Sequence, residues 1–159
     1  MTHLNEEWAE TMIKNLLKKV EKLEADVFNV KIKSQKEKAK YPYIVGDWEE
    51  TPEGLVVDGY VDFGNSGKIK MKTLPVKFKS VSGDFKVWSL GLTSFENFPE
   101  TIGGNARMCQ NKFEGYKDFP KEIGGELTIM SNWGKTKYTK AIIKKICNVR
   151  DGIHGSDAK

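Results

Sequence analysis

The stretch PETIGGNARMCQNKFEGYKDFPKEIGGELTI, residues 99–129, contains the motif Pro-x-x-Ile-Gly-Gly twice, at a spacing of 21 residues. The second glycine of each motif belongs to a longer series of four glycines: Gly59, Gly83, Gly104 and Gly125. Apolar residues stand two and four places after each of these four glycines. A sequence period of this length is typical of solenoids, whose repeats bury their apolar faces against one another. The sequence therefore predicts a β-rich repeat domain over residues 52–135.

The apolar pairs after the glycines are Val61 and Phe63, Phe85 and Val87, Ala106 and Met108, and Leu127 and Ile129. Alternation of this kind places each pair on one face of a short strand. Glycine allows the preceding turn to be tight and to approach its neighbour closely. With one strand per repeat, we expect the strands to stack in parallel. The first glycine spacing is 24 residues, and we expect its extra residues to fall between Pro75 and Gly83.

The places one and three after each glycine should form two ladders on the outer face of the stacked strands. Solenoids usually bind partners along such surfaces. The candidate partner-binding residues are Tyr60, Asp84, Asn105 and Glu126 in the first ladder, and Asp62, Lys86, Arg107 and Thr128 in the second. A sheet face that is only solvated stays the alternative.

Residues 1–26 predict an amphipathic helix that begins after Asn5. Its apolar residues recur at spacings of three and four, as on one face of a helix. The residues that could pair two copies of the chain are Ile13, Leu16, Val20 and Leu23. The stripe can pack on the repeat domain or form a homodimeric coiled coil, and two heptads do not decide between these.

Residues 27–51 predict a connector with one strand, since Phe28, Val30 and Ile32 alternate with polar residues. A polar loop over 34–40 should follow. Residues 136–159 predict a helix that closes the array, with Thr136 or Thr139 as the cap and Gly152 as the stop, followed by a frayed tail from Ile153 to Lys159. The fold class expected is therefore α+β: an N-terminal amphipathic helix, a short solenoid-like β repeat domain and a C-terminal capping helix.

Composition favours a folded protein of the cytoplasm, because no apolar run approaches the ~20 residues needed to cross a bilayer. The two cysteines, Cys109 and Cys147, form no metal-binding or disulfide pattern. The histidines, His3 and His154, lie in the terminal segments, and no motif of a known catalytic class occurs. We therefore expect a binding protein that is not an enzyme and has no cofactor or metal.

A lysine-rich region gives a second functional hypothesis, a regulator that binds nucleic acid. Five lysines are interspersed with apolar residues: Lys68, Lys70, Lys72, Lys77 and Lys79. Further lysines occur over residues 31–40. On a strand, such a stripe could contact phosphates. It could also protect a sheet edge from pairing with other chains, which is the interpretation that we favour.

Three units, LPVKFKSVSGDFKVWSLGLTSFENFP, ETIGGNARMCQNKFEGYKDFP and KEIGGELTIMSNW, resemble the leucine-rich-like tandem repeats of small proteins from T4-like tailed phages. The resemblance covers residues 52–133. The chain departs from that pattern by carrying aromatic residues where leucine is usual, so no functional residue is carried over.

The resemblance implies a non-catalytic protein that binds and disables a host protein in the host cytoplasm. Among small phage proteins, an inhibitor of the ATP-dependent host protease Lon is similar in size. Host Lon protease is therefore the specific partner that the resemblance suggests.

Overall fold

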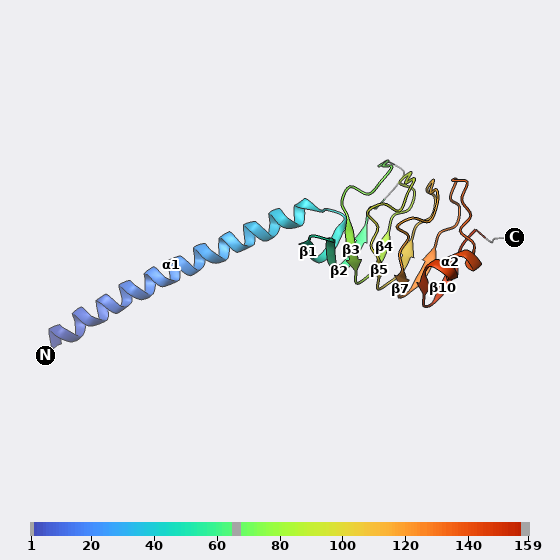
Figure 1. The fold of residues 1–159 in the computed structure, drawn as a ribbon. Coiled ribbons are helices and arrows are strands. Elements are labelled where there is room, and N and C mark those ends of the chain that lie inside the picture. Colours follow the sequence, from blue (N-terminus) through green and yellow to red (C-terminus); the bar gives the residue numbers. More distant parts are fainter. Residues whose placement is uncertain (1, 65–67, 157–159) are drawn as a thin grey trace. The chain divides into compact units, whose positions relative to one another are not determined.

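The computed structural model describes residues 2–64 and 68–156, and the chain divides into two units, Met1–Pro42 and Tyr43–Lys159 (Figure 1). The first unit is a helix, and the second is a β-solenoid whose short strands stack along its length. Mixed α and β structure is therefore confirmed.

Helix α1 spans Thr2–Lys40 and is much longer than predicted. The strand predicted over Phe28 to Ile32 and the loop predicted over 34–40 are both wrong, because these residues are helical. The physical reason is that nothing interrupts the helix, since the first proline after it is Pro42 and the first glycine is Gly46. The alternation that indicated a strand also continues the helical spacing of three and four.

The solenoid begins with a hairpin of β1, Ile44–Thr51, and β2, Gly54–Asp62, which pair in antiparallel register along their whole lengths. Gly46 and Gly59 face each other, and a Cβ at Gly59 would lie 2.1 Å from the carbonyl oxygen of Val45. The other edge of β2 pairs with both β3 and β4. The hairpin therefore covers the first rung of the array.

Two parallel ladders run from β2 through the rest of the chain, so each repeat holds two short strands rather than the single strand predicted. Ladder A continues through β3 Phe78–Val81, β5 Thr101–Ile102, β7 Glu122–Ile123 and β9 Asn148–Val149. Ladder B continues through β4 Phe85–Lys86, β6 Ala106–Arg107, β8 Glu126–Thr128 and β10 Gly152–His154.

The glycine register predicted from the sequence is confirmed in ladder B. Successive partners across the strands are Val61, Phe85, Ala106, Leu127 and Ile153, and all of them are buried. Phe85, Met108 and Ile129 are likewise fully buried in the same unit. The apolar side of the array is therefore one continuous core.

Glycines form the corner between the two ladders because neighbouring turns of the solenoid lie too close for side chains. A Cβ on Gly104 would lie 2.8 Å from the carbonyl carbon of Gly83, and one on Gly124 would lie 2.3 Å from the carbonyl oxygen of Gly103. The amide of Gly104 donates to the oxygen of Gly83, and that of Gly125 to the oxygen of Gly104. Close backbone contact is thus the reason for the Ile-Gly-Gly motif.

Aromatic side chains form the wall of the core opposite the ladders. Phe95 stacks on Phe113 with ring centroids 4.2 Å apart, and it meets Phe119 and Tyr138 edge to face at 4.9 and 5.7 Å. Offset and edge-to-face geometries are the favourable ones for aromatic pairs. These rings fill the interior of the core on that side.

One buried polar side chain, Asn111, ties adjacent turns together. Its Oδ1 accepts from the amides of Leu90 and Leu92, each at 3.1 Å. Its Nδ2 donates to the carbonyl of Val87 at 2.7 Å and to carbonyls within its own turn. Asn132 occupies the equivalent place in the next turn and accepts from the amide of Asn111. An asparagine at this corner therefore replaces backbone hydrogen bonds that the turn cannot make.

The extra residues of the first repeat do not lie between Pro75 and Gly83, as predicted. The amide of Glu100 donates to the oxygen of Lys79, so the chain is already in the 21-residue register at that point. The longer segment follows Phe63 instead. Lys68 to Lys72 belongs to this segment and forms no strand, so the predicted lysine strand is wrong.

Helix α2, Lys140–Ile146, lies within the last turn, and Thr139 is its N-cap, with Oγ1 accepting from the amide of Ile142. The helix ends before the predicted stop, because Gly152 belongs to β10. The expected frayed tail from residue 153 is also corrected, since Ile153 is buried against ladder B. The final rung is therefore made by β9 and β10 rather than by the helix.

Candidate interaction surface

The residues predicted to form the second row of surface side chains, Asp62, Lys86, Arg107 and Thr128, lie next to one another on the strands of ladder B. Strand pairing aligns Asp62 with Lys86, Lys86 with Arg107, and Arg107 with Thr128. Neighbouring strands lie about 4.8 Å apart, so these side chains form a regular row. The structure adds His154 at the end, opposite Thr128. We call Asp62, Lys86, Arg107, Thr128 and His154 the ladder B strip.

Side chains along the ladder B strip differ in their polar neighbours. Lys86 Nζ lies 3.8 Å from Asp62 Oδ2 and 5.9 Å from the ring centroid of Tyr60. At the far end, His154 Nε2 lies 3.9 Å from Glu126 Oε2. Arg107 is exposed and has no ionic partner among the residues that the structure describes. The strip therefore presents one unmatched guanidinium.

Two residues of the first predicted ladder have structural hydrogen bonds. Asp84 Oδ1 accepts from the amide of Asn105, and Asn105 Oδ1 accepts from the amide of Glu126, both at 2.8 Å. Each side chain thus bonds the turn that follows it. Tyr60 and Glu126 stay exposed and flank the ladder B strip.

His154 was missed because the sequence beyond Gly152 was assigned to a tail. A weak signal was present, since Ile153 is an apolar residue between two polar ones directly after a glycine. The 21-residue spacing had been broken by α2, so the last glycine no longer matched the register. A search for a displaced final repeat would have found it.

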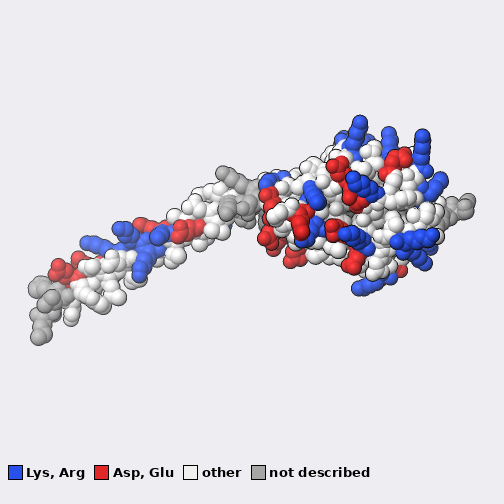
Figure 2. All heavy atoms as spheres, viewed as in Figure 1, with Lys and Arg blue, Asp and Glu red and all other residues white. Residues whose placement is uncertain are grey.

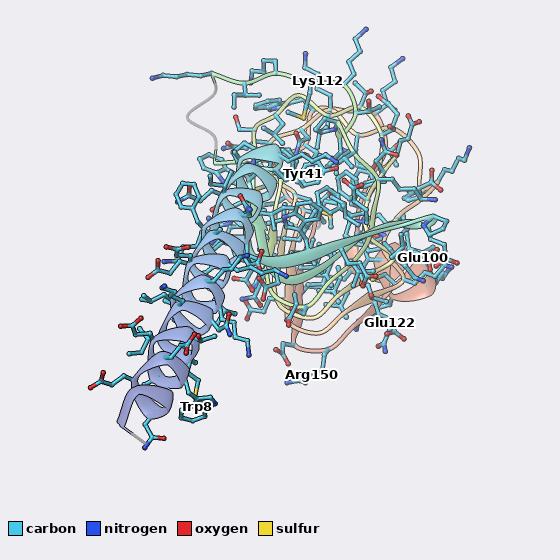
Figure 3. All side chains as sticks on the ribbon, turned by 90° about the vertical axis from the view of Figure 1, so that its left-hand side faces the viewer. Trp8, Tyr41, Glu100, Lys112, Glu122 and Arg150 are labelled. Carbon is cyan, nitrogen blue, oxygen red and sulfur yellow. The ribbon has the colours of Figure 1, made fainter. Side chains whose placement is uncertain are left out.

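A second exposed region lies on the third side of the solenoid, formed by the segments that follow the ladder B strands in each turn. Backbone hydrogen bonds join the chain at Lys72 to Thr93, at Leu92 to Lys112, and at Asn111 to Trp133. The exposed residues of this side, which we call the basic rim, are Lys70, Lys72, Lys112, Trp133 and Lys135. Figure 2 shows lysine side chains along the upper edge of this unit, and Figure 3 places Lys112 there.

The basic rim is richer in positive charge than the rest of the third side. Glu114 is its acidic neighbour, and its Oε1 accepts from the amide of Lys135. The indole of Trp133 is 66% exposed. Figure 3 places Glu122 and Arg150 on the side of the solenoid opposite Lys112.

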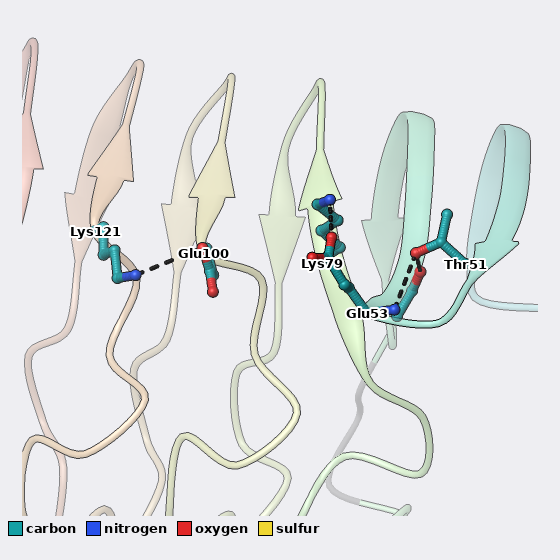
Figure 4. Close-up of polar contacts among 6 residues, drawn as sticks. Thr51, Glu53, Lys79, Glu100 and Lys121 are labelled. Atoms are coloured by element: carbon teal, nitrogen blue, oxygen red, sulfur yellow. Dashed lines mark hydrogen bonds and ion pairs between the residues drawn. The ribbon is translucent and has the colours of Figure 1, made fainter.

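A row of alternating acidic and basic side chains runs across the beginnings of the ladder A strands. Lys79 pairs with Glu53, and Lys121 Nζ lies 3.5 Å from Glu100 Oε2 (Figure 4). The hydrogen bond and charge of Lys79 lower the pKa of Glu53, and Glu53 in turn raises the pKa of Lys79. Lys79 therefore has a carboxylate partner within its own unit.

Within residues 2–64 and 68–156, no group of three or more His, Cys, Asp or Glu side chains is placed to hold a metal ion. No helix in these ranges has the length and apolar character needed to cross a membrane.

Comparison of the chain with known protein families, with curated proteins and with solved structures finds no match in any of the three.

Proposed function

We propose that the protein acts by binding, as a non-catalytic inhibitor of a host cytoplasmic protein, and that the ladder B strip makes the contact. The supporting observation is Arg107, an exposed and unmatched guanidinium on a rigid ladder. The amide of Val87 donates to the oxygen of Arg107, so the backbone carrying the side chain is fixed by the adjacent turn.

A fixed guanidinium selects the chemistry of its partner. Arginine offers parallel donors that match a carboxylate, and little ordering is needed when the backbone is already held. Lys86 and His154 lie on either side of Arg107 in the same row. The partner that fits is a protein surface with a central acidic side chain.

Host Lon protease is the specific partner that we propose to test first. This choice rests on the size of the chain and on the resemblance of its repeats to those of small phage proteins, and the phage origin is part of the proposal. The proposed binding role rests on the ladder B strip.

The test measures degradation of an unfolded substrate by Lon at rising concentrations of the protein. We expect inhibition by the wild type and at least about tenfold weaker inhibition by Arg107→Glu, because a buried charge contact becomes repulsive. Lys117→Glu is the matched control, since it makes the same charge change at an exposed lysine outside the strip.

If Lon is unaffected, affinity capture with mass spectrometry separates the specific partner from the class. A host protein captured by the wild type and by Lys117→Glu, but not by Arg107→Glu, would replace Lon and retain the proposal. Equal capture by all three proteins, or capture of nothing at low salt, would contradict the ladder B strip as the binding surface.

A nucleic-acid-binding regulator is the second candidate, and the basic rim favours it. Trp133 is exposed between Lys112 and Lys135 along the chain, and an exposed indole beside lysines is suited to a stacked base and its phosphates. The lysines that carry this hypothesis are therefore those of the rim, which retains Lys70 and Lys72 of the predicted stripe and adds Lys112 and Lys135.

Titration with single-stranded oligonucleotides tests this candidate, with the change in tryptophan fluorescence assigned to Trp133 by its loss in Trp133→Phe, because the chain has four tryptophans. Binding should weaken steeply with salt, since each neutralised phosphate releases counterions. Lys112→Glu should reduce binding, whereas Lys121→Glu, on another side of the solenoid, should change it less. Absence of binding at about 50 mM salt, where such contacts are strong, would exclude this candidate.

A further inference from the structure

Helix α1 exposes a long row of large apolar side chains. From Met12 to Val30 they are between 47% and 67% exposed, whereas the core residues of the solenoid are at most 8% exposed. The residues of this row are Met12, Ile13, Leu16, Leu17, Val20, Leu23, Val27 and Val30, and Trp8 and Phe28 are exposed on the other side of the helix. Exposed apolar surface of this extent marks an interaction site. Most helical stability in proteins comes from packing an apolar face, so α1 would gain stability by burying this one.

The row has the heptad pattern of a coiled coil, and the long helix extends it beyond the two heptads predicted. In heptad notation, the a positions are Ile13, Val20 and Val27, and the d positions are Ala9, Leu16, Leu23 and Val30. β-Branched residues at a with leucine at d favour parallel two-stranded coiled coils. Both leucines of the seam are at d, and every a residue is β-branched.

The flanking positions are complementary between two copies in the same register. In a parallel pair, each g residue faces the e residue five places later in the other copy. Lys19 at g then faces Glu24, and Asp26 at g faces Lys31, so both pairs attract. Met12 at g faces Leu17, which widens the apolar seam where no charge lies.

We propose that α1 pairs with α1 of a second copy as a parallel, in-register two-stranded coiled coil from Ala9 to Val30. At 1.5 Å per residue this seam is about 33 Å long, or three heptads. The occupant of the apolar face is thus a second copy of this chain. In a parallel pair both solenoids follow the same end of the seam.

Sedimentation equilibrium of the full chain tests the pairing. We expect a mass twice the chain mass of 18.0 kDa at micromolar concentrations. Leu23→Asp removes a d residue from both copies and should weaken the dimer at least about 100-fold. Lys22→Asp, one residue away on the outer face of the helix, should leave the mass unchanged.

A charge exchange tests the parallel direction. Lys19→Glu should weaken the dimer, because it faces Glu24 of the other copy. Adding Glu24→Lys should restore it, since the attraction is reversed in both pairs. In an antiparallel pair Lys19 would instead face Asp26, so the double variant would stay weak and the parallel arrangement would be overturned.

Cysteine cross-linking gives an independent measure of direction. Ile13→Cys, in a Cys109→Ser background, should form a disulfide between two copies under mild oxidation. In an antiparallel seam residue 13 faces residue 30, about 25 Å from the other residue 13, so no cross-link would form.

Three results would overturn the proposal. One is a monomer at tens of micromolar. Another is a dimer that Leu23→Asp does not weaken, which would place the contact on the solenoid. The third is a monomer in which Leu23→Asp exposes apolar surface to a dye, which would mean that the row packs on its own chain.

Discussion

The solenoid buries most of its large apolar side chains, whereas the helix exposes them. In the solenoid, glycine corners bring the turns together until side chains such as Phe85 and Phe95 are fully buried. In α1, a leucine such as Leu23 stays 63% exposed. The solenoid therefore contains the contacts that stabilise it, whereas the helix leaves its apolar face exposed. The predictions below test each side of this difference.

The largest effect is expected from filling a glycine corner. In Gly124→Ala the new Cβ would lie 2.3 Å from the oxygen of Gly103, and backbone atoms must move. We expect a loss of at least about 3 kcal/mol in the free energy of unfolding, or failure to fold. Denaturant unfolding measures it.

Gly152→Ala is the matched control, because its nearest neighbour would be Glu126 Cγ at 3.9 Å. Both substitutions restrict the unfolded chain equally, so the difference between them reports the native contact. Similar stabilities for the two variants would show that the corners are not closely packed.

The next effect is expected at Asn111. In Asn111→Ala the amides of Leu90 and Leu92 lose their acceptor inside the core. Unsatisfied buried groups make this substitution cost about 2–3 kcal/mol of stability. Asn132→Ala at the half-buried equivalent should cost less, and equal losses in denaturant unfolding would contradict the special role of Asn111.

The helix should respond to dilution when the solenoid does not. If α1 is stabilised by a second copy, each tenfold dilution lowers the stability of the pair by about 1.4 kcal/mol. Circular dichroism at 222 nm should therefore show a helical transition that shifts with concentration. The near-ultraviolet signal of the buried aromatic rings should melt at a fixed temperature. A single transition independent of concentration would remove the difference between the two units.

The sequence predicted the solenoid better than the helix for a physical reason. Close approach at Gly83 and Gly104 permits only one residue type, so the register is visible in a single chain. At Phe28 and Val30 the helical and extended spacings coincide, and the absence of a breaker before Pro42 was the deciding signal. Local pattern is ambiguous where no residue is sterically required.

The candidate surface was predictable only in part. Strand register placed Asp62, Lys86 and Arg107 in one row, as the glycine spacing indicated. The sequence could not show that Asp84 and Asn105 bond the next turn, because that depends on the corner geometry. The basic rim was visible only in part, since Lys70 and Lys72 belong to the predicted stripe, whereas Lys112 and Lys135 come from later turns of the solenoid.

The smallest effect separates the two cysteines of the solenoid. Burial raises the pKa of the Cys147 thiol to about 11, from an ordinary value of 9.0, so the folded state keeps a proton that the unfolded state loses. The stabilisation is complete below pH 9 and is lost as the pH rises toward 11, by about 1 kcal/mol at pH 10.

Cys147→Ala should reduce this loss of stability between pH 9 and 11, and denaturant midpoints at several pH values measure it. The helix contains no cysteine, so this effect belongs to the solenoid alone. Cys109 should be alkylated faster than Cys147 in the folded protein, since Cys109 is half-buried and Cys147 is buried. If Cys147 reacts first in the folded protein, the last turn of the solenoid opens more readily than its packing indicates, and the contrast between a self-sufficient solenoid and a dependent helix weakens at that end.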